Sequence, residues 1–354
     1  MPLENSLHTH LHAGQVIPAH PLALTHDGRF DEQRHRALTR YYIDAGAGGI
    51  AVAVHTTQFA IRQPSVGLLE PVLALTSETA DDYAEKRSRP VLKIAGVCGG
   101  THQAVAEAEL AVTHGYHAAL LSLSALRDAP VNQLVDHCRA VADVIPVFGF
   151  YLQSTIGGCR LPYTFWRRFA EIDNVVAIKM APFNRYHTID VVRAVCESGR
   201  ADDIALYTGN DDNIVVDLLT NYQFHTPRGP VSKRIVGGLL GHWAVWTRHA
   251  VDLLDRVHAA TADGAPVGSG LLTEAVSVTD ANAVLFDAAN DYRGCIPGIH
   301  ETLLQQGLLK STRCLDPDES LSPGQAEELE RISLAYPEMD DREFIAENID
   351  SWLA

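Results

Sequence analysis

Short apolar runs alternate with amphipathic segments from the N-terminus to about residue 242. Helical spacing separates the runs, as over 31–45, where Leu38, Tyr41 and Ala45 share one face and Asp31 is placed to cap the start. Apolar runs separated by helical segments are typical of βα units around a parallel sheet. The eight runs are 15–20, 48–55, 90–97, 118–123, 146–151, 175–179, 204–209 and 234–240.

Eight such units predict an α/β fold, a (β/α)8 TIM barrel, over residues 15–241. Residues 1–14 precede the first run and are expected to form an N-terminal strap. Residues 242–354 keep only helical periodicity, which predicts a C-terminal helical extension. The segment 225–234 contains Pro and Gly that break both periods, so we expect a loop there.

Composition narrows the class of partner. The net charge of −16 argues against nucleic acid and against an anionic membrane surface, because both would repel the chain. The 6 cysteines contain no C-x-x-C pair, which fits reduced thiols in the cytoplasm. We find no signal-peptide pattern and no apolar run near the roughly 20 residues that a membrane span needs. The sequence thus predicts a soluble cytoplasmic protein without membrane or nucleic-acid partners.

Three histidines alternate near the N-terminus, at His8, His10 and His12. In a strand such residues would point to one face, and many metal-dependent barrel hydrolases carry His-x-His at the end of their first strand. Here the histidines precede the first apolar run, and the strand ends after Lys179 offer no histidine. A metal-dependent, amidohydrolase-like barrel therefore stays a weak alternative, and we expect no metal ligands.

Polar residues at the strand ends are the candidates for chemistry, because catalytic groups of such barrels lie there. Lys179 closes the run 175–179, where burial would lower its pKa and expose an amine that can form a Schiff base. Tyr151 ends the preceding strand, where its phenol could shuttle protons. Thr56 and Thr57 follow the second run and could hold a carboxylate. Each candidate also has a structural alternative: Lys179 as a lysine at the strand rim, Tyr151 as a core aromatic residue, and Thr56 and Thr57 as an ordinary turn.

Several short motifs follow in order between about residue 15 and residue 335. They include H-T-T-Q-F (55–59), G-V-C-G-G-T-H (96–102), G-F-Y-L-Q-S (149–154), N-V-V-A-I-K (174–179), T-G-N-D-D (208–212) and C-I-P-G-I-H-E-T-L-L (295–304). Their order and spacing resemble the dihydrodipicolinate synthase/N-acetylneuraminate lyase family of class I, Schiff-base aldolases. The resemblance implies a 2-oxo acid such as pyruvate and an aldehyde as substrates, no cofactor, and a homodimer or homotetramer.

The resemblance also implies roles for individual residues. Lys179 would form the Schiff base, Tyr151 would relay protons, and Thr56 and Thr57 would bind the carboxylate of the 2-oxo acid. Gly209 lies in the motif of the seventh strand and is expected in the substrate site.

Two histidines at strand ends, His20 and His55, are further candidates for the substrate site. Imidazole titrates near neutral pH, so both could supply acid–base function. A histidine hydrogen-bonded for structure is the alternative for each, and the sequence leaves the two interpretations open.

The chain departs from the synthase members of that family at two places. Ile156 stands where they carry an arginine, and Ser124-Ala125-Leu126 where they carry Pro-Tyr-Tyr. Ile156 is expected to line a less polar pocket. These departures predict a lyase or aldolase that cleaves or forms a C–C bond, or dehydrates, and that is not a true dihydrodipicolinate synthase. A barrel that binds a 2-oxo acid without catalysis is the remaining alternative.

Overall fold

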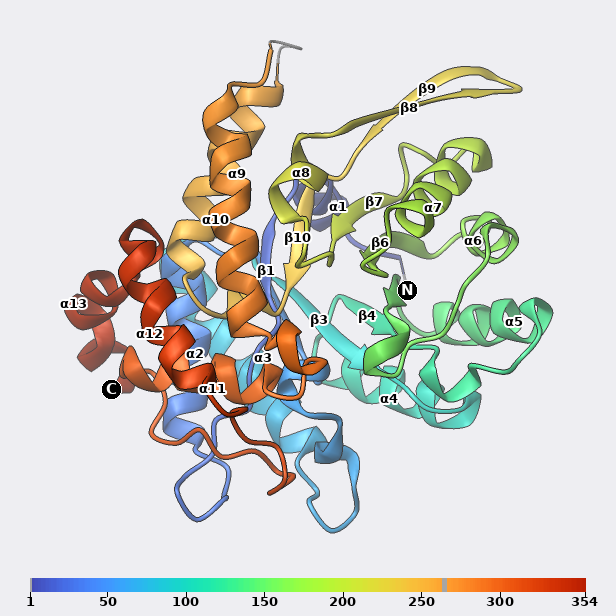
Figure 1. Ribbon diagram of the computed structural model, residues 1–354. Coiled ribbons are helices and arrows are strands. Elements are labelled where there is room, and N and C mark those ends of the chain that lie inside the picture. The colour runs from blue at the N-terminus through green and yellow to red at the C-terminus, as the bar shows by residue number, and fades with distance from the viewer. Residues whose placement is uncertain (1, 263–265) are drawn as a thin grey trace. The chain divides into compact units, whose positions relative to one another are not determined.

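Eight strands of the computed structural model, which describes residues 2–262 and 266–354, lie where the apolar runs predict them (Figure 1). One eight-stranded sheet has the order β1-β10-β7-β6-β5-β4-β3-β2. The bounds are β1 Val16–Pro18, β2 Gly49–Val52, β3 Leu92–Val97, β4 Ala118–Leu121, β5 Val147–Leu152, β6 Val175–Ala181, β7 Ala205–Thr208 and β10 Gly237–Leu240.

The two strands at the ends of this order bond to each other. The Gly48 N–H donates to the carbonyl of Val16 over 3.1 Å, and the His20 N–H donates to that of Ala51 over 2.8 Å. Because the last strand in the order pairs with the first, the sheet closes on itself. The predicted (β/α)8 barrel is confirmed.

Helices follow the strands, as the sequence predicts. The Asp31 carboxylate accepts from the Arg34 N–H over 3.1 Å at the start of α2, and Gly46, with φ 105°, ends that helix. The helices of the barrel are α2 Glu32–Ala45, α3 Leu69–Arg87, α4 Thr101–Thr113, α5 Val131–Ala142, α6 Tyr163–Phe169, α7 Arg185–Ser198 and α8 Ile214–Leu219.

After β10 the described chain is helical, as expected. The longer helices are α9 Thr247–Thr261, α10 Ser269–Leu285, α11 Cys295–Gln305, α12 Gln325–Ala335 and α13 Arg342–Leu353. None of the helices in the described ranges is long and apolar enough to cross a membrane.

Contacts group the chain into two compact units. The first contains residues 1–15 and 94–239, and the second contains residues 16–93 and 240–354. This grouping runs through barrel strands, so the boundaries expected after residues 14 and 241 stay predictions.

The N-terminal histidines lie on a helix, α1 (Asn5–Ala13). His8 and His12 share a helix face, with ring centroids 4.2 Å apart, while His10 lies two residues from each, so the three histidines do not point to one face as they would in a strand. The Tyr207 hydroxyl of β7 donates to the Leu11 carbonyl over 2.7 Å and fixes this helix to the first unit.

The segment predicted as a loop is a β-hairpin. β8 (Asn221–Thr226) pairs antiparallel with β9 (Gly229–Arg234), and the pair packs on α7 (Figure 1). Gly229 has a positive φ of 112° at the turn, which glycine adopts easily. Pro230 has no N–H to donate, but both strands of a two-stranded sheet are edge strands, where proline is tolerated. The breaking residues therefore mark a turn between strands and not an irregular loop.

Gly237→Ala is expected to destabilise the first unit by about 1–3 kcal/mol, because the barrel leaves no room for a methyl group there. A Cβ on Gly237 would lie 2.5 Å from the Gln15 carbonyl oxygen and 2.6 Å from its nitrogen, both rigid backbone atoms. The free energy of unfolding in urea measures the effect. Gly100→Ala, where a Cβ meets nothing within 4 Å, is the control, and equal stability of the two variants would contradict the expectation.

Candidate active site

Lys179 lies at the fifth position of β6, with 8% of its surface exposed. Its aliphatic chain packs against the backbone that follows β7, since a Cβ on Gly209 would lie 2.5 Å from Lys179 Cε and 2.9 Å from its Cγ. A hydrogen bond from the Gly209 N–H to the Met180 carbonyl, 2.7 Å long, fixes this contact. Gly209 therefore lies against Lys179 and leaves room for the lysine side chain, and its place in a substrate site stays a prediction.

Burial lowers the pKa of Lys179 to about 8, and the Asp211 carboxylate opposes part of that decrease. An amine with this pKa is partly neutral near physiological pH, and the neutral form is the nucleophile. The lowered pKa expected from the sequence thus follows from the burial of the strand end.

The reactivity of Lys179 toward a small acylating reagent is expected to rise with pH and to be half-maximal near pH 8. The sign follows from protonation: the amine is blocked as ammonium below its pKa and free above it. Mass spectrometry of the labelled Lys179 peptide across a pH series measures the midpoint. A midpoint near the ordinary lysine value of about 10.4 would contradict the buried environment.

The ring that faces the amine belongs to Phe150. Lys179 Nζ lies 4.6 Å from the centroid of this ring, and the two residues are register partners on β5 and β6. Phe148, two residues earlier, packs edge-on against Tyr207 with centroids 5.3 Å apart. Phe148 and Phe150 therefore share the face of the sheet that carries Lys179.

Tyr151 lies on the opposite, helix-covered face of β5. Its ring packs against Trp166 of α6 and His187 of α7, with centroids 5.4 and 5.6 Å away, and its hydroxyl accepts from the Leu161 N–H over 3.3 Å. In this placement the phenol points away from the amine, and proton relay by Tyr151 stays a prediction. Strand alternation is the reason, because adjacent residues point to opposite faces.

A buried carboxylate organises the turn after β7, a feature that the sequence analysis missed. Asp217, fully buried, accepts from Thr208 Oγ1 at 2.8 Å, from Asn210 Nδ2 at 2.9 Å and from Asn213 Nδ2 at 3.1 Å, and forms an ion pair with Arg185. Four donors to one carboxylate hold the turn in a single conformation. The polar segment 208–213 after an apolar strand was the available signal.

Asn210 joins this turn to the chain that follows Lys179. Its Oδ1 accepts from the Phe183 N–H over 3.1 Å, and its Nδ2 also donates to Thr188 Oγ1 over 3.1 Å. Phe183 has a positive φ of 48°, which is uncommon for a residue with a bulky side chain. The ends of β6 and β7 are therefore tied to each other by side-chain hydrogen bonds.

In the second unit, Thr56 and Thr57 lie in a short 3-10 turn, His55–Thr57, and are both buried. Thr56 Oγ1 donates to the Ala19 carbonyl over 2.8 Å, and Thr57 Oγ1 donates to the His20 carbonyl over 2.7 Å. Each hydroxyl has one proton, and both protons are used to fix the turn to the end of β1. Carboxylate binding by these two residues stays a prediction, and it would depend on donors other than the hydroxyl protons.

His20 is fully buried and has a structural role. Its Nδ1 lies 2.7 Å from the Pro21 carbonyl and its Nε2 lies 3.0 Å from Thr39 Oγ1, so both ring nitrogens are engaged. Burial lowers its pKa to about 4, which keeps the ring neutral at physiological pH. These contacts favour the structural alternative for His20, and its place in the substrate site stays a prediction.

The two remaining predicted residues are half-buried. His55 has its ring centroid 6.1 Å from that of Phe59, and Ile156 ends a short 3-10 turn, Ser154–Ile156. Neither placement assigns a role, so their contribution to substrate binding stays a prediction.

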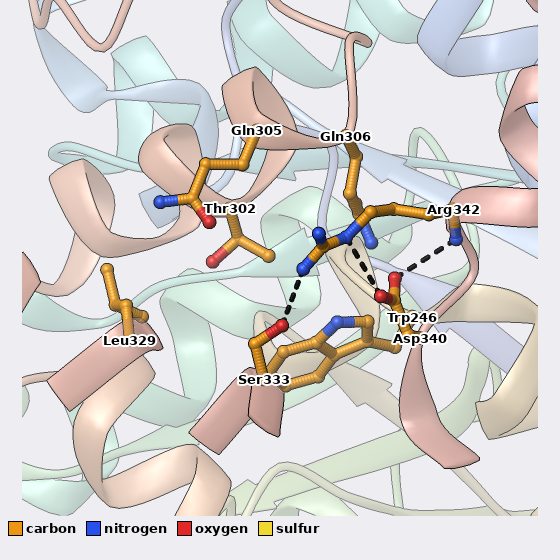
Figure 2. A pocket seen from close by; sticks show the side chains of 8 residues that line it. All are labelled: Trp246, Thr302, Gln305, Gln306, Leu329, Ser333, Asp340 and Arg342. Atoms are coloured by element: carbon orange, nitrogen blue, oxygen red, sulfur yellow. Dashed lines mark hydrogen bonds and ion pairs between the residues drawn. The ribbon is translucent and has the colours of Figure 1, made fainter. Parts of the chain in front are cut away.

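Within residues 2–262 and 266–354, no group of three His, Cys, Asp or Glu side chains is arranged to hold a metal ion. A pocket among the C-terminal helices contains none of the predicted site residues (Figure 2). In it Arg342 already pairs with Asp340 at 2.8 Å and donates to Ser333 Oγ at 2.5 Å, which satisfies its charge within the protein.

The family model of the dihydrodipicolinate synthetase family matches residues 12–221. The chain belongs to this family. A 4-hydroxy-tetrahydrodipicolinate synthase of Sulfurihydrogenibium sp. (strain YO3AOP1) is 27% identical over 187 residues, which cover 52% of this chain and 59% of the relative. Another, of Campylobacter concisus (strain 13826), is 30% identical over 196 residues, covering 54% and 61%. The matched region thus spans about three fifths of each of these two relatives.

A solved structure of N-acetylneuraminate lyase from Fusobacterium nucleatum has the same fold. It aligns with a TM-score of 0.70 at 15% identity, covering 91% of this chain and 98% of that one. At this identity the likeness shows the fold alone. The family match ends at residue 221, the first residue of the β8–β9 hairpin.

Proposed function

We propose that this protein is a Schiff-base-forming lyase or aldolase that acts on a 2-oxo acid, pyruvate or a pyruvate-derived adduct. The observation that carries the proposal is the buried Lys179 at the end of β6, whose pKa is lowered to about 8, in a chain of this family. The neutral amine attacks the C2 carbonyl carbon, and loss of water gives an iminium. The iminium withdraws electrons from the adjacent C–C bond, which can then form or break.

The remaining predicted residues have assigned places in this proposal. The turn of Thr56 and Thr57 binds the carboxylate of the 2-oxo acid, which its position directly after β2 supports. Ile156 gives an apolar side chain to the part of the site that holds the aldehyde-derived half, and His55 is a candidate for acid–base function. The assembly is a homodimer or homotetramer in the cytoplasm, and the substrates are small molecules.

We propose further that the reaction is not dihydrodipicolinate synthesis. Ile156 cannot bind a second carboxylate as an arginine would, and Ser124-Ala125-Leu126 offers no phenol after β4. A less polar aldehyde half, joined or released at a C–C bond or dehydrated, suits these residues. Formation of 4-hydroxy-tetrahydrodipicolinate from pyruvate and the corresponding amino-aldehyde at an enzymatic rate would contradict this part of the proposal.

Reductive trapping tests the Schiff base itself. Incubation with pyruvate and borohydride should add one reduced pyruvate to the intact mass, and peptide mapping should place it on Lys179. A panel of 2-oxo acids with sugar-like and aromatic aldehydes then identifies the reaction. Absence of an adduct at saturating pyruvate, or an adduct confined to surface lysines, would contradict the proposal.

A barrel that binds a 2-oxo acid without catalysis is the second candidate. It is favoured by the phenyl ring of Phe150 beside the amine, because a phenyl group cannot transfer a proton. A binding protein would form the Lys179 adduct but would not exchange the methyl protons of pyruvate with deuterium from solvent. The proposed lyase does both.

A further inference from the structure

The pocket among the C-terminal helices of the second unit has a polar lining (Figure 2). Its walls come from α11, α12 and the residues at the starts of α9 and α13. Leu329 gives it an aliphatic side chain. The other lining side chains all carry nitrogen or oxygen atoms: Trp246, Thr302, Gln305, Gln306, Ser333, Asp340 and Arg342. This lining suits a ligand that forms hydrogen bonds better than an apolar one.

The side chain of Gln306 has hydrogen bonds still to make. It is 8% exposed, and among residues 2–262 and 266–354 neither its Oε1 nor its Nε2 has a hydrogen-bond partner. Burial of an amide without partners is costly, because the lost contacts with water are not replaced. The amide offers an acceptor and two N–H donors within one planar group. A bound group that both donates and accepts hydrogen bonds would pair with it.

The charged side chains of the pocket already have partners. Arg342 Nε lies 2.8 Å from Asp340 Oδ2, and Arg342 Nη2 donates to Ser333 Oγ over 2.5 Å. Asp340 Oδ1 accepts from the backbone N–H of Arg342 over 3.0 Å. A charged ligand would lose water contacts here without finding an opposite charge that is free. The pocket therefore favours a neutral ligand.

Trp246 gives the pocket an aromatic surface. The ring of His242 lies edge-on to its indole ring, with centroids 5.5 Å apart. Trp246 has a positive φ of 53°, a value that residues with bulky side chains adopt rarely. Strained backbone of this kind is concentrated at ligand sites and active sites. An indole ring has a flat apolar face, against which the C–H groups of a sugar ring or a polyol can pack.

The pocket is small and partly open. Its empty volume is about 260 Å³, which includes space that is open to solvent. Pockets for drug-sized ligands begin at about 300 Å³. A ligand no larger than one sugar ring, with one side toward solvent, suits this space.

We propose that this pocket binds a small neutral polyhydroxylated molecule, a single monosaccharide or a polyol. Each hydroxyl group donates one hydrogen bond and accepts others, so two neighbouring hydroxyl groups pair with Oε1 and Nε2 of Gln306. The C–H groups of the ligand pack on Trp246. The site takes part in no step of the Schiff-base chemistry, so the inference goes beyond the proposed function and does not depend on it.

Titration calorimetry of the full chain tests the binding, with myo-inositol, D-glucose and D-ribose as probes. At least one of these should bind with a Kd of about 10 mM or lower. D-Gluconate resembles D-glucose but carries a charge, and it should bind at least about tenfold more weakly than the neutral probe. No binding of any neutral probe, or binding of gluconate as tight as that of the neutral probes, would overturn the inference.

Gln306→Leu tests the role of the amide. The affinity for the neutral probe should fall about tenfold or more, because its hydroxyl groups lose their partners. The free energy of unfolding should stay the same or rise, since the variant removes a buried amide without partners.

Gln305→Leu is the matched control. Gln305 lines the same pocket, but its Nε2 already donates to Glu301 Oε1 over 2.9 Å. This variant should change the affinity less than about twofold. An equal loss of affinity in Gln305→Leu and Gln306→Leu, or no loss in a folded Gln306→Leu protein, would overturn the inference.

A crystal structure of the unchanged protein with the tightest-binding probe keeps the inference testable if Gln306→Leu folds poorly. The expected result is density for the probe in the pocket, with hydroxyl groups at hydrogen-bond distance from the Gln306 amide and C–H groups against Trp246. Water alone in the pocket, or the probe bound only elsewhere on the protein, would overturn the inference.

Discussion

Lys179→Met is expected to abolish the borohydride-stable adduct with pyruvate and to lower any C–C lyase turnover by about 10³-fold or more. Methionine fills a similar volume but has no amine, so neither the carbinolamine nor the iminium can form. The free energy of unfolding should stay the same or increase, because the variant removes a buried ionisable group that burial disfavours. Intact-mass analysis and a thermal melt measure the two effects.

Lys93→Met is the matched control for this prediction. Lys93 is also a buried barrel lysine, but its Nζ pairs with the Asp81 carboxylate at 2.6 Å and donates to Ser77 Oγ at 2.9 Å. Its replacement should leave the adduct intact. An adduct that persists in Lys179→Met and disappears in Lys93→Met would place the Schiff base on Lys93 of β3 and contradict its assignment to Lys179.

Asp217→Ala is expected to destabilise the protein by about 3–5 kcal/mol, the largest stability effect of any single replacement considered. The change leaves Thr208, Asn210 and Asn213 without their shared acceptor and Arg185 without its buried partner. Unfolding in urea, followed by tryptophan fluorescence and circular dichroism, gives the free energy. The Lys179 adduct should also form more slowly, because the turn that packs on the lysine loses its anchor.

A surface aspartate that also pairs with an arginine serves as the control for Asp217. Asp136 and Arg139 lie 3.3 Å apart with side chains 69% and 49% exposed, so Asp136→Ala should cost less than about 1 kcal/mol. A loss in Asp217→Ala no larger than in Asp136→Ala would mean that the buried network does not stabilise the turn.

The sequence predicted the barrel because its strands are buried on both faces and therefore appear as continuous apolar runs. All eight strands of the barrel overlap those runs, and Lys179 lies near the end of the sixth. The hairpin was missed because Gly229 and Pro230 interrupt the alternation of apolar and polar residues that marks a strand. Both are nevertheless compatible with a two-stranded sheet and its turn. The spacing of the histidines could not show that they lie on a helix, because a spacing of two does not distinguish a strand from a short helix.

The face on which Tyr151 lies could not be predicted from the sequence. A shift of one residue in a strand exchanges its two faces, and β5 carries a register irregularity between Val147 and Phe148. Motif spacing identified the strand but not whether Phe150 or Tyr151 faces the lysine. The hydrogen-bond network of the buried Asp217 carboxylate was missed for a related reason, because its partners come together only after the turn has folded.

A structure of the protein soaked with pyruvate and reduced with borohydride tests the central claim most directly. The account predicts continuous electron density between Lys179 Nζ and the C2 carbon of the ligand, with Phe150 beside the new bond. Density for pyruvate without a covalent bond to Lys179, or attached to another lysine, would contradict it.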